Sequence, residues 1–194
     1  MGIPEAKMQQ FLASLLSSKL PAHFIYHNFE HALYVTKKAE EIARHEHCTE
    51  EEITLIRTAG LWHDAGCIVV YNGHEEESCR LAQQYLPQFD FSANDIEIIC
   101  GMIMATKVPQ SPTNKLEEIL ADADLEYLGT NTAAEKAVDL FKELQSLTPS
   151  LTQAEWNKMQ INFLQNHQYF TSYCKEKKEH LKQAYLKELI AASE

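Results

Sequence analysis

Apolar side chains recur along most of this chain at spacings of three and four residues, the repeat that places them on one face of a helix. Residues 68–71, Ile-Val-Val-Tyr, form a strand-like run, but four residues are more typical of a connector. The predicted fold class is all-α, a single domain over 1–194 with a core at about 20–130 and C-terminal helices at about 131–194. The predicted helices cover residues 5–18, 28–47, 49–64, 74–86, 93–105, 115–128, 131–146, 152–168 and 172–191.

Three of these helix starts carry capping signals. Asn28 precedes an apolar-periodic segment, and asparagine is a favoured N-cap residue. Thr49 and Thr152 are each followed three residues later by a glutamate, Glu52 and Glu155, which is the pattern of a capping box. We therefore expect helices to begin at these three positions.

Charge and composition exclude several kinds of partner. The chain has 194 residues and a formal net charge of −11, without the basic stripe that nucleic-acid binding requires. No apolar run approaches the roughly 18 residues of a membrane span, and the first residues lack a signal-peptide layout. The five cysteines occur singly, as reduced thiols do. We expect a cytoplasmic protein without nucleic-acid or membrane partners, in which any anionic substrate needs a locally positive site.

Two histidines at the start of the second predicted helix share one helical face. His27 and His31 lie four residues apart in the stretch YHNFEHALYV. Such a pair can converge on a metal ion, on a phosphate, or on each other. Residues elsewhere in the chain must decide between these interpretations.

His63 and Asp64 are the second group of interest. Adjacent helical residues diverge by about 100°, so both reach one point only if it lies beside the helix, as a bound ion would. Ala59 and Gly60, one turn earlier, are small and leave room there for a ligand. Imidazole and carboxylate together suit Mn, Fe, Zn or Mg. The alternative is a buried hydrogen bond between the two side chains that closes the helix end.

A further carboxylate comes from the stretch ILADADLEYLG. On a helical wheel, Asp124 flanks the apolar face, whereas Asp122 points away from it. A buried carboxylate needs a counter-charge, and a cation supplies one. Asp124 is therefore the predicted ligand. Asp122 is the alternative ligand, and otherwise a solvated surface acid.

The pattern His, His-Asp, Asp over three helices resembles the HD-domain metal-dependent phosphohydrolase superfamily. The stretch YHNFEHA, residues 26–32, is similar to the YHNxxHA signature of the cyclic-nucleotide phosphodiesterase branch. This resemblance covers about residues 20–130 and implies that His27 is a general acid. It implies a metal site whose ligands are His31, His63, Asp64 and Asp124.

By this resemblance the protein is a metal-dependent hydrolase of a small phosphate ester, with a nucleotide or cyclic nucleotide phosphodiester as the expected substrate. The expected cofactor is a divalent ion, Mn, Mg, Fe or Zn. The purine-clamping glutamine and aromatic of the phosphodiesterase branch cannot be placed here. His74 is the one histidine between Asp64 and Asp124, which favours one metal, or a second ion loosely held. The alternatives are a metal- or nucleotide-binding module without turnover, and a diiron enzyme of the inositol-oxygenase type.

Other residues are weaker candidates for substrate contact. His74 and Glu75 belong to a GHEEES segment similar to one in small bacterial HD hydrolases, although acidic residues also favour a helix N-terminus by themselves. Lys107 is a candidate phosphate contact or a solvated lysine. Trp62 and Trp156 are predicted core residues, and Trp62, next to His63, is a possible wall of the site.

Overall fold

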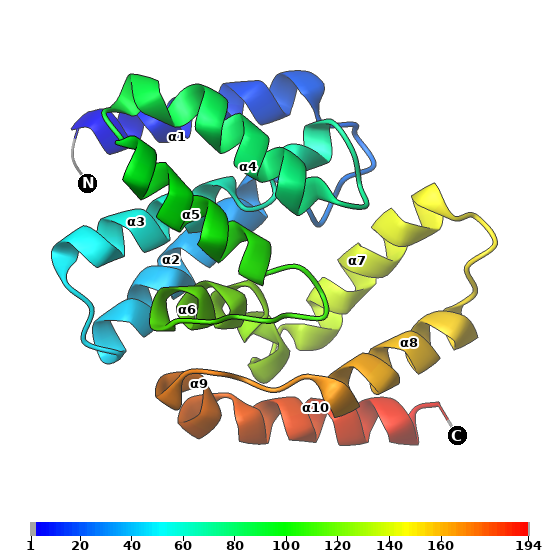
Figure 1. The fold of residues 1–194 in the computed structure, drawn as a ribbon. Helices are drawn as coiled ribbons and strands as arrows, with labels where there is room; N and C mark the ends of the chain where they lie inside the picture. Colours follow the sequence, from blue (N-terminus) through cyan, green and yellow to red (C-terminus); the bar gives the residue numbers. More distant parts are fainter. Residues whose placement is uncertain (1–2, 194) are drawn as a thin grey trace.

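The computed structural model describes residues 3–193, and within this range the chain is all-α, as predicted (Figure 1). None of the helices in the described range is long and apolar enough to cross a membrane. Three short 3-10 helices, η1 (Ala65–Ile68), η2 (Leu86–Phe89) and η3 (Glu126–Gly129), extend or link the α-helices. The α-helices are α1 (Ile3–Lys19), α2 (Phe29–His45), α3 (Glu50–Trp62), α4 (His74–Tyr85), α5 (Ala93–Ala105), α6 (Lys115–Asp124), α7 (Ala133–Leu147), α8 (Gln153–Asn166), α9 (Ser172–Lys177) and α10 (Glu179–Ala191).

The predicted helix starts are confirmed. The Asn28 side chain accepts a hydrogen bond from the backbone N–H of His31 at 3.0 Å, which caps α2. Both predicted capping boxes form, at Thr49 before α3 and at Thr152 before α8. A third box, from Ser92 before α5, was not predicted. Local side-chain chemistry therefore sets where these helices begin.

Two predicted helices are shorter or divided. The helix expected over 115–128 ends at Asp124, and η3 follows it. The helix expected over 172–191 breaks at Lys178 into α9 and α10. Both differences occur where the chain makes a close contact. A Cβ on Gly129 would lie 2.7 Å from the Lys178 carbonyl oxygen, so the end of η3 lies directly against the break.

Helices α2, α3, α5 and α6 pack against one another around the main hydrophobic core. Figure 1 shows α1 and α4 on one side of this group and α9 and α10 on the opposite side. Gly60 of α3 allows the close packing of α2, because a Cβ there would lie 3.1 Å from the Thr36 Cα. The small residue that was expected to leave room for a ligand thus serves helix packing instead.

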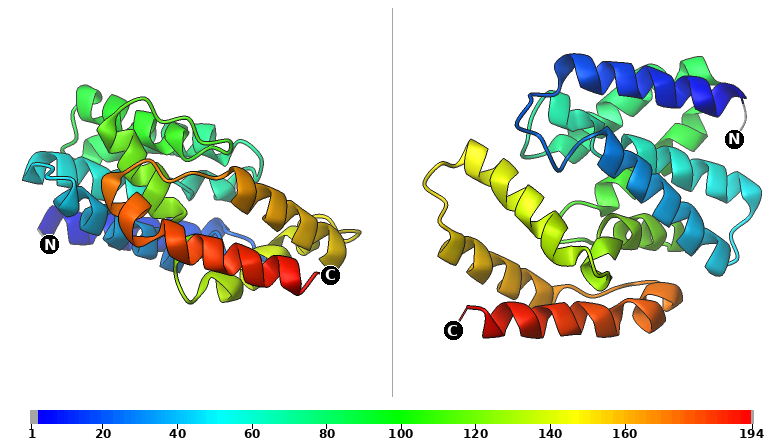
Figure 2. Two further views of the ribbon diagram at one scale, coloured as in Figure 1. Left: turned by 90° about the horizontal axis from the view of Figure 1, so that it is seen from below. Right: turned by 180° about the vertical axis from the view of Figure 1, so that it is seen from behind.

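The C-terminal helices form a second packed region. Buried side chains of η3, α8 and α10 make a smaller hydrophobic cluster that includes Tyr127, Leu164 and Leu186. Phe141 of α7 stacks on Trp156 of α8, with ring centroids 5.9 Å apart. In the view from behind, α7 and α8 lie to one side of the central helices, and α10 runs beneath them (Figure 2). This arrangement leaves a cavity between the central group and the α7–α8 pair.

Candidate metal centre

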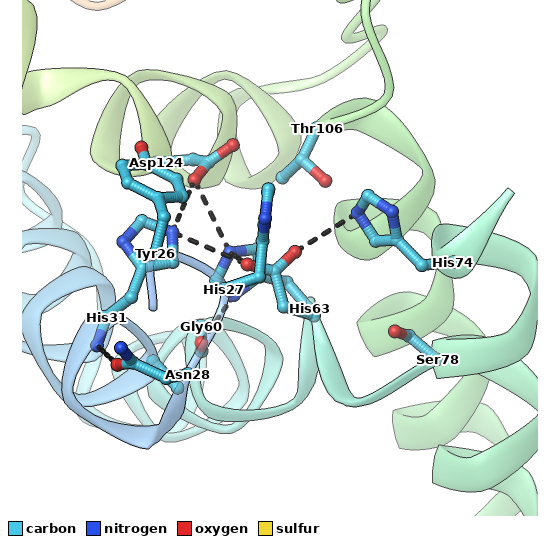
Figure 3. Close-up of polar contacts among 12 residues, drawn as sticks. Tyr26, His27, Asn28, His31, Gly60, His63, His74, Ser78, Thr106 and Asp124 are labelled. Atoms are coloured by element: carbon cyan, nitrogen blue, oxygen red, sulfur yellow. Dashed lines mark hydrogen bonds and ion pairs between the residues drawn. The ribbon is translucent and has the colours of Figure 1, made fainter. Parts of the chain in front are cut away.

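Four polar side chains converge beside this cavity, and two of them, Asp64 and Asp124, line it. Figure 3 shows His31, His63 and Asp124 close together. The first turn of α2 contributes His31, the end of α3 and the turn after it contribute His63 and Asp64, and the last turn of α6 contributes Asp124. His31 Nε2 lies 3.1 Å from Asp124 Oδ1 and 3.4 Å from Asp64 Oδ2. His63 Nε2 lies 3.0 Å from Asp64 Oδ2 and 3.4 Å from Asp124 Oδ1. Three segments far apart in sequence thus bring their donor atoms to one point.

These separations match a shared cation. Ligand atoms bound to one ion at about 2.0–2.2 Å lie roughly 3.0–3.4 Å apart when neighbouring bonds enclose about 90–110°. His31, His63 and Asp124 also have ligand atoms that all lie within 4.8 Å of one another. The donor set of imidazole nitrogens and carboxylate oxygens suits a divalent transition metal or Mg²⁺. The residues present therefore fit a metal ion.

The hydrogen bonding of His63 supports this fit. Its Nδ1 lies 2.8 Å from the Gly60 carbonyl oxygen, so Nδ1 carries a proton and donates it. In the neutral ring, Nε2 then presents a lone pair to the Asp64 oxygen. Neither His63 Nε2 nor Asp64 Oδ2 makes a hydrogen bond of good geometry within the described part of the chain, although both are buried. Two acceptors face each other here, which is stable only with a proton or a cation between them.

The electrostatics of the cluster favour an added positive charge. Burial alone would lower the pKa of His63, but the carboxylates of Asp64 and Asp124 outweigh burial and raise that pKa to about 10. Burial would raise the pKa of Asp64, but His63 and His27 hold it well below its usual range. The cluster therefore binds a proton when no cation is present, and a cation would compete with that proton.

The structure separates the two candidate aspartates. Asp124 faces His31 and His63, whereas Asp122 faces away from the cluster. Asp122 accepts hydrogen bonds from the backbone N–H groups of Phe170 and Thr171 at 2.9 and 2.8 Å, and from the Thr171 hydroxyl at 2.6 Å. The expectation of a solvated surface acid was wrong, because Asp122 is fully buried under the segment that precedes α9. Periodicity within α6 could not show that this distant segment covers it.

His27 lies beside the cluster but outside it. Its ring centroid is 6.3 Å from that of His31, and the side chain lines the cavity. His27 Nδ1 contacts a carboxylate oxygen of Glu143, from α7. The other Glu143 oxygen accepts hydrogen bonds from the backbone N–H groups of Tyr26 and His27, at 2.8 and 3.1 Å. The contact to Nδ1 leaves Nε2 as the nitrogen that can exchange a proton with a ligand.

Sequence reasoning missed Glu143. The residue is fully buried, and although burial would raise its pKa, His27 and two backbone N–H groups lower it overall. One signal existed, because Glu143 lies three residues after Leu140 and beside Leu144 on an amphipathic helix, at the edge of the apolar face. The same reasoning had singled out Asp124. Nothing in the local pattern, however, could pair Glu143 with a histidine 116 positions earlier.

A second group of ligand-type residues adjoins the first. Asp64, Cys67 and His74 have ligand atoms within 4.8 Å of one another, and Asp64 Oδ1 lies 3.2 Å from His74 Nε2. His74 Nδ1 donates to the Tyr71 carbonyl oxygen at 2.7 Å. Burial raises the pKa of the Cys67 thiol to about 12. Asp64 thus lies between two groups of possible metal ligands. Nothing in the sequence had indicated that Cys67 belongs to one of them.

The backbone around Gly66 places His74 beside this second group. A Cβ on Gly66 would lie 2.1 Å from the His74 carbonyl oxygen, so only glycine allows η1 to lie against the start of α4. The Gly66 N–H also donates to the Ser78 hydroxyl at 2.8 Å. The turn after Asp64 and the first turns of α4 are therefore held together by backbone contact.

The cavity has a volume of about 490 Å³ and includes the other predicted substrate contacts. Glu75 is buried, with Oε1 3.8 Å from His74 Nε2, and it lines the cavity. Lys107 also lines the cavity, but its ammonium is exposed and pairs with Glu76. Trp62 is a core residue, as predicted, and stacks on Phe11. Trp156, also predicted to be core, is buried but lines the cavity, because α8 forms one wall.

Comparisons with known proteins agree with this geometry. The family model described as HD domain matches residues 28–126, which is just over half of the chain. The chain therefore belongs to the HD-domain family, and its site has the donor set of a metal-dependent hydrolase. Among solved structures, it is similar to a predicted HD superfamily hydrolase from an uncultured Thermotogales bacterium. That match has a TM-score of 0.62 and 18% identity, and covers 99% of this chain and 97% of the other. Comparison with curated proteins gives no match.

Proposed function

We propose that this protein is a metal-dependent phosphohydrolase that cleaves a small phosphate ester at the cavity wall. The proposed metal ligands are His31, His63, Asp64 and Asp124. The observation that carries the proposal is the set of four ligand atoms, from three buried residues and the partly buried Asp124, that face one another at 3.0–3.4 Å. A bound divalent ion would lower the pKa of water and neutralise charge on the phosphoryl oxygens.

Side chains of the protein would supply the proton transfer and the substrate contacts. Hydrolysis adds water to phosphorus and breaks the bond to the leaving oxygen, which needs a proton. His27 is the proposed donor of that proton, because it lines the cavity next to the cluster and its Nε2 is not committed to Glu143. Glu143 is a positioning residue that fixes the orientation and tautomer of His27. His74, Glu75 and Lys107 are proposed substrate contacts at the same wall.

A nucleotide or cyclic nucleotide was the substrate expected from the sequence, and it stays a prediction. Two other functions compete with hydrolysis, namely binding without turnover and diiron oxygenation. A bare binding site has no need for a histidine held by a buried carboxylate beside the metal ligands, so the pairing of His27 with Glu143 favours turnover. A diiron centre would have to draw its second ligand set from Asp64, Cys67 and His74.

The test is a panel of phosphomonoesters and phosphodiesters, which includes p-nitrophenyl phosphate, bis-p-nitrophenyl phosphate, nucleoside monophosphates and cyclic nucleotides. The purified protein is stripped by chelation and reloaded with Mn, Mg, Fe or Zn, and metal content is measured separately. We expect activity with at least one ester that follows reloading and is lost on chelation. Full activity after thorough chelation, or tight metal binding with no turnover of any ester, would contradict the proposal.

A further inference from the structure

The cavity continues from the metal centre into a region of different character. Beyond His27 and Asp124, its walls are formed by η3, α7 and α8. On α7, Ala137, Leu140 and Leu144 line the cavity at a spacing of three and four residues, so one apolar helix face points into it. α8 contributes a similar stripe that includes Met159 and Phe163. A pocket that is polar at one end and apolar at the other binds amphiphilic ligands.

Polar partners are scarce in this distal region. Among the α8 side chains that line the cavity, Gln160 carries an amide group. Its Oε1 already accepts a hydrogen bond from the Tyr185 hydroxyl at 3.1 Å. A nucleobase and ribose carry several donors and acceptors, which lose free energy when they are buried without partners. The charges around the cavity also argue against a nucleotide substrate. Lys107 is the lysine among the lining residues, and it pairs with Glu76, while the chain as a whole carries a net charge of −11. The several negative charges of a nucleotide would therefore meet little positive charge from the protein in this cavity.

Two of the exposed residues that line the cavity are apolar, and two others, Asn72 and Lys107, are polar. Val108 and Met159 line the cavity, and they are 56% and 51% exposed. Exposed apolar side chains beside a cavity are typical of a place where an apolar ligand enters. The volume of about 490 Å³ is within the range of pockets that enclose an organic ligand.

We propose that the substrate is a phosphate ester with one extended apolar organic group, which lies along the α7–α8 wall while the phosphate lies at the metal centre. This inference rests on the proposed function, because it takes the cluster as the phosphate end. It differs from the nucleotide expectation in a measurable way. Each buried methylene contributes about 0.8 kcal/mol, so affinity should rise about fourfold per added methylene until the cavity is filled.

The experiment uses n-alkylphosphonates from ethyl to octyl, which cannot be hydrolysed, with binding measured by calorimetry on the Mn-loaded protein. We expect affinity to rise about fourfold per methylene, with a heat-capacity change that becomes more negative with chain length. Octylphosphonate should bind more tightly than adenosine monophosphate. An affinity independent of chain length, or tighter binding of the nucleotide, would overturn the inference.

Two variants locate the effect. Met159→Gln removes an apolar side chain from the cavity at a half-exposed position, so the fold should tolerate it. We expect it to weaken octylphosphonate binding about fivefold and ethylphosphonate binding hardly at all. Val138→Gln is the matched control, because Val138 on α7 is 49% exposed and is not a lining residue. If Met159→Gln and Val138→Gln behave alike, the apolar wall does not bind the ligand.

Turnover separates this inference from the proposed function. The same chain-length series is measured as n-alkyl phosphates and methyl n-alkyl diesters, and p-nitrophenyl phosphate is measured alongside. Hydrolysis of p-nitrophenyl phosphate without any chain-length preference in binding or turnover would overturn the apolar substrate alone. Chain-length-dependent binding without hydrolysis of any ester would overturn the proposed function, while the amphiphile-binding cavity would stand.

Discussion

Two carboxylates at the end of α6, the fully buried Asp122 and the partly buried Asp124, have opposite surroundings. Asp124 faces the imidazoles of His31 and His63, whereas Asp122 faces the N–H groups of Phe170 and Thr171 on the other side of the helix. Burial raises the pKa of Asp122, and its hydrogen bonds do not fully offset this. Burial would do the same to Asp124, but His31 and His63 hold its pKa below the usual range. The pKa values of the two carboxyl groups thus shift in opposite directions because their partners differ.

This difference shows that burial of a carboxylate does not by itself indicate a metal site. The carboxylate of Asp122 is satisfied by hydrogen-bond donors, so it fixes the segment before α9 and needs no cation. The Asp124 side is built of acceptors and titratable rings that face one another, so it needs a positive charge. Glu143 combines both features, because it accepts two backbone N–H groups and also contacts the His27 ring.

The largest expected effect separates the two aspartates directly. Asp124→Ala should lose bound metal and lower activity more than about 10³-fold, because a metal ligand contributes several kcal/mol of transition-state stabilisation. His63→Ala should do the same. Metal content by elemental analysis after gel filtration, together with turnover of p-nitrophenyl phosphate, measures both effects. Asp122→Ala is the matched control and should retain its metal. Full metal retention in His63→Ala and Asp124→Ala would refute the ligand assignment.

The next effect concerns His27, which lies beside the cluster without sharing its contacts. His27→Ala should lower turnover of alkyl esters about 10²–10⁴-fold, because it removes the proposed proton donor. The loss should be smaller for p-nitrophenyl esters, whose leaving group hardly needs a proton, and metal content should not change. His23→Ala is the control, because His23 is an exposed histidine four residues earlier in the segment before α2. Loss of metal in His27→Ala would make His27 a ligand instead, and full activity on alkyl esters would make it a packing residue.

A third effect tests whether Asp122, on the face of α6 away from the cluster, stabilises the fold. Asp122→Ala leaves the buried N–H groups of Phe170 and Thr171 without their acceptor, which should cost about 3 kcal/mol of unfolding free energy. Urea unfolding monitored by circular dichroism measures this loss. Glu118→Ala, on the same helix but with a half-exposed side chain, should change stability little. A stability unchanged in Asp122→Ala would mean that solvent or another donor replaces these contacts.

The sequence predicted the parts of the molecule that local chemistry controls. Helix starts at Asn28, Thr49 and Thr152 follow from side chains within one turn, so they were predicted correctly. The ends of α6 and α9 were not predicted, and the segments that follow them, η3 and the break at Lys178, lie against each other at Gly129. A close approach between segments about fifty residues apart leaves no periodic signal in either of them.

The same distinction holds for the site. His31, His63 and Asp124 were singled out by helical position and by resemblance to a known family, and the structure brings them together. The burial of Asp122 and the partner of His27 depend on the C-terminal third of the chain, which local patterns could not place against the core. The apolar wall of α7 and α8 was likewise invisible, since an amphipathic helix that lines a cavity has the same pattern as one that packs on a core.

The smallest expected effect concerns Glu143, the carboxylate that combines both kinds of contact. Glu143→Gln keeps the shape and one acceptor oxygen for the N–H groups of Tyr26 and His27, but removes the charge beside the His27 ring. Partners that orient a functional histidine typically contribute about 10–100-fold, so turnover of alkyl esters should fall by that factor. KM and metal content should stay unchanged, because Glu143 does not contact the cluster. Turnover against pH should also change shape, since the ionised partner of His27 is gone. Glu135→Gln, exposed on the same helix, is the control. A loss of stability without a change in turnover or pH profile would mean that Glu143, like Asp122, only ties two segments together.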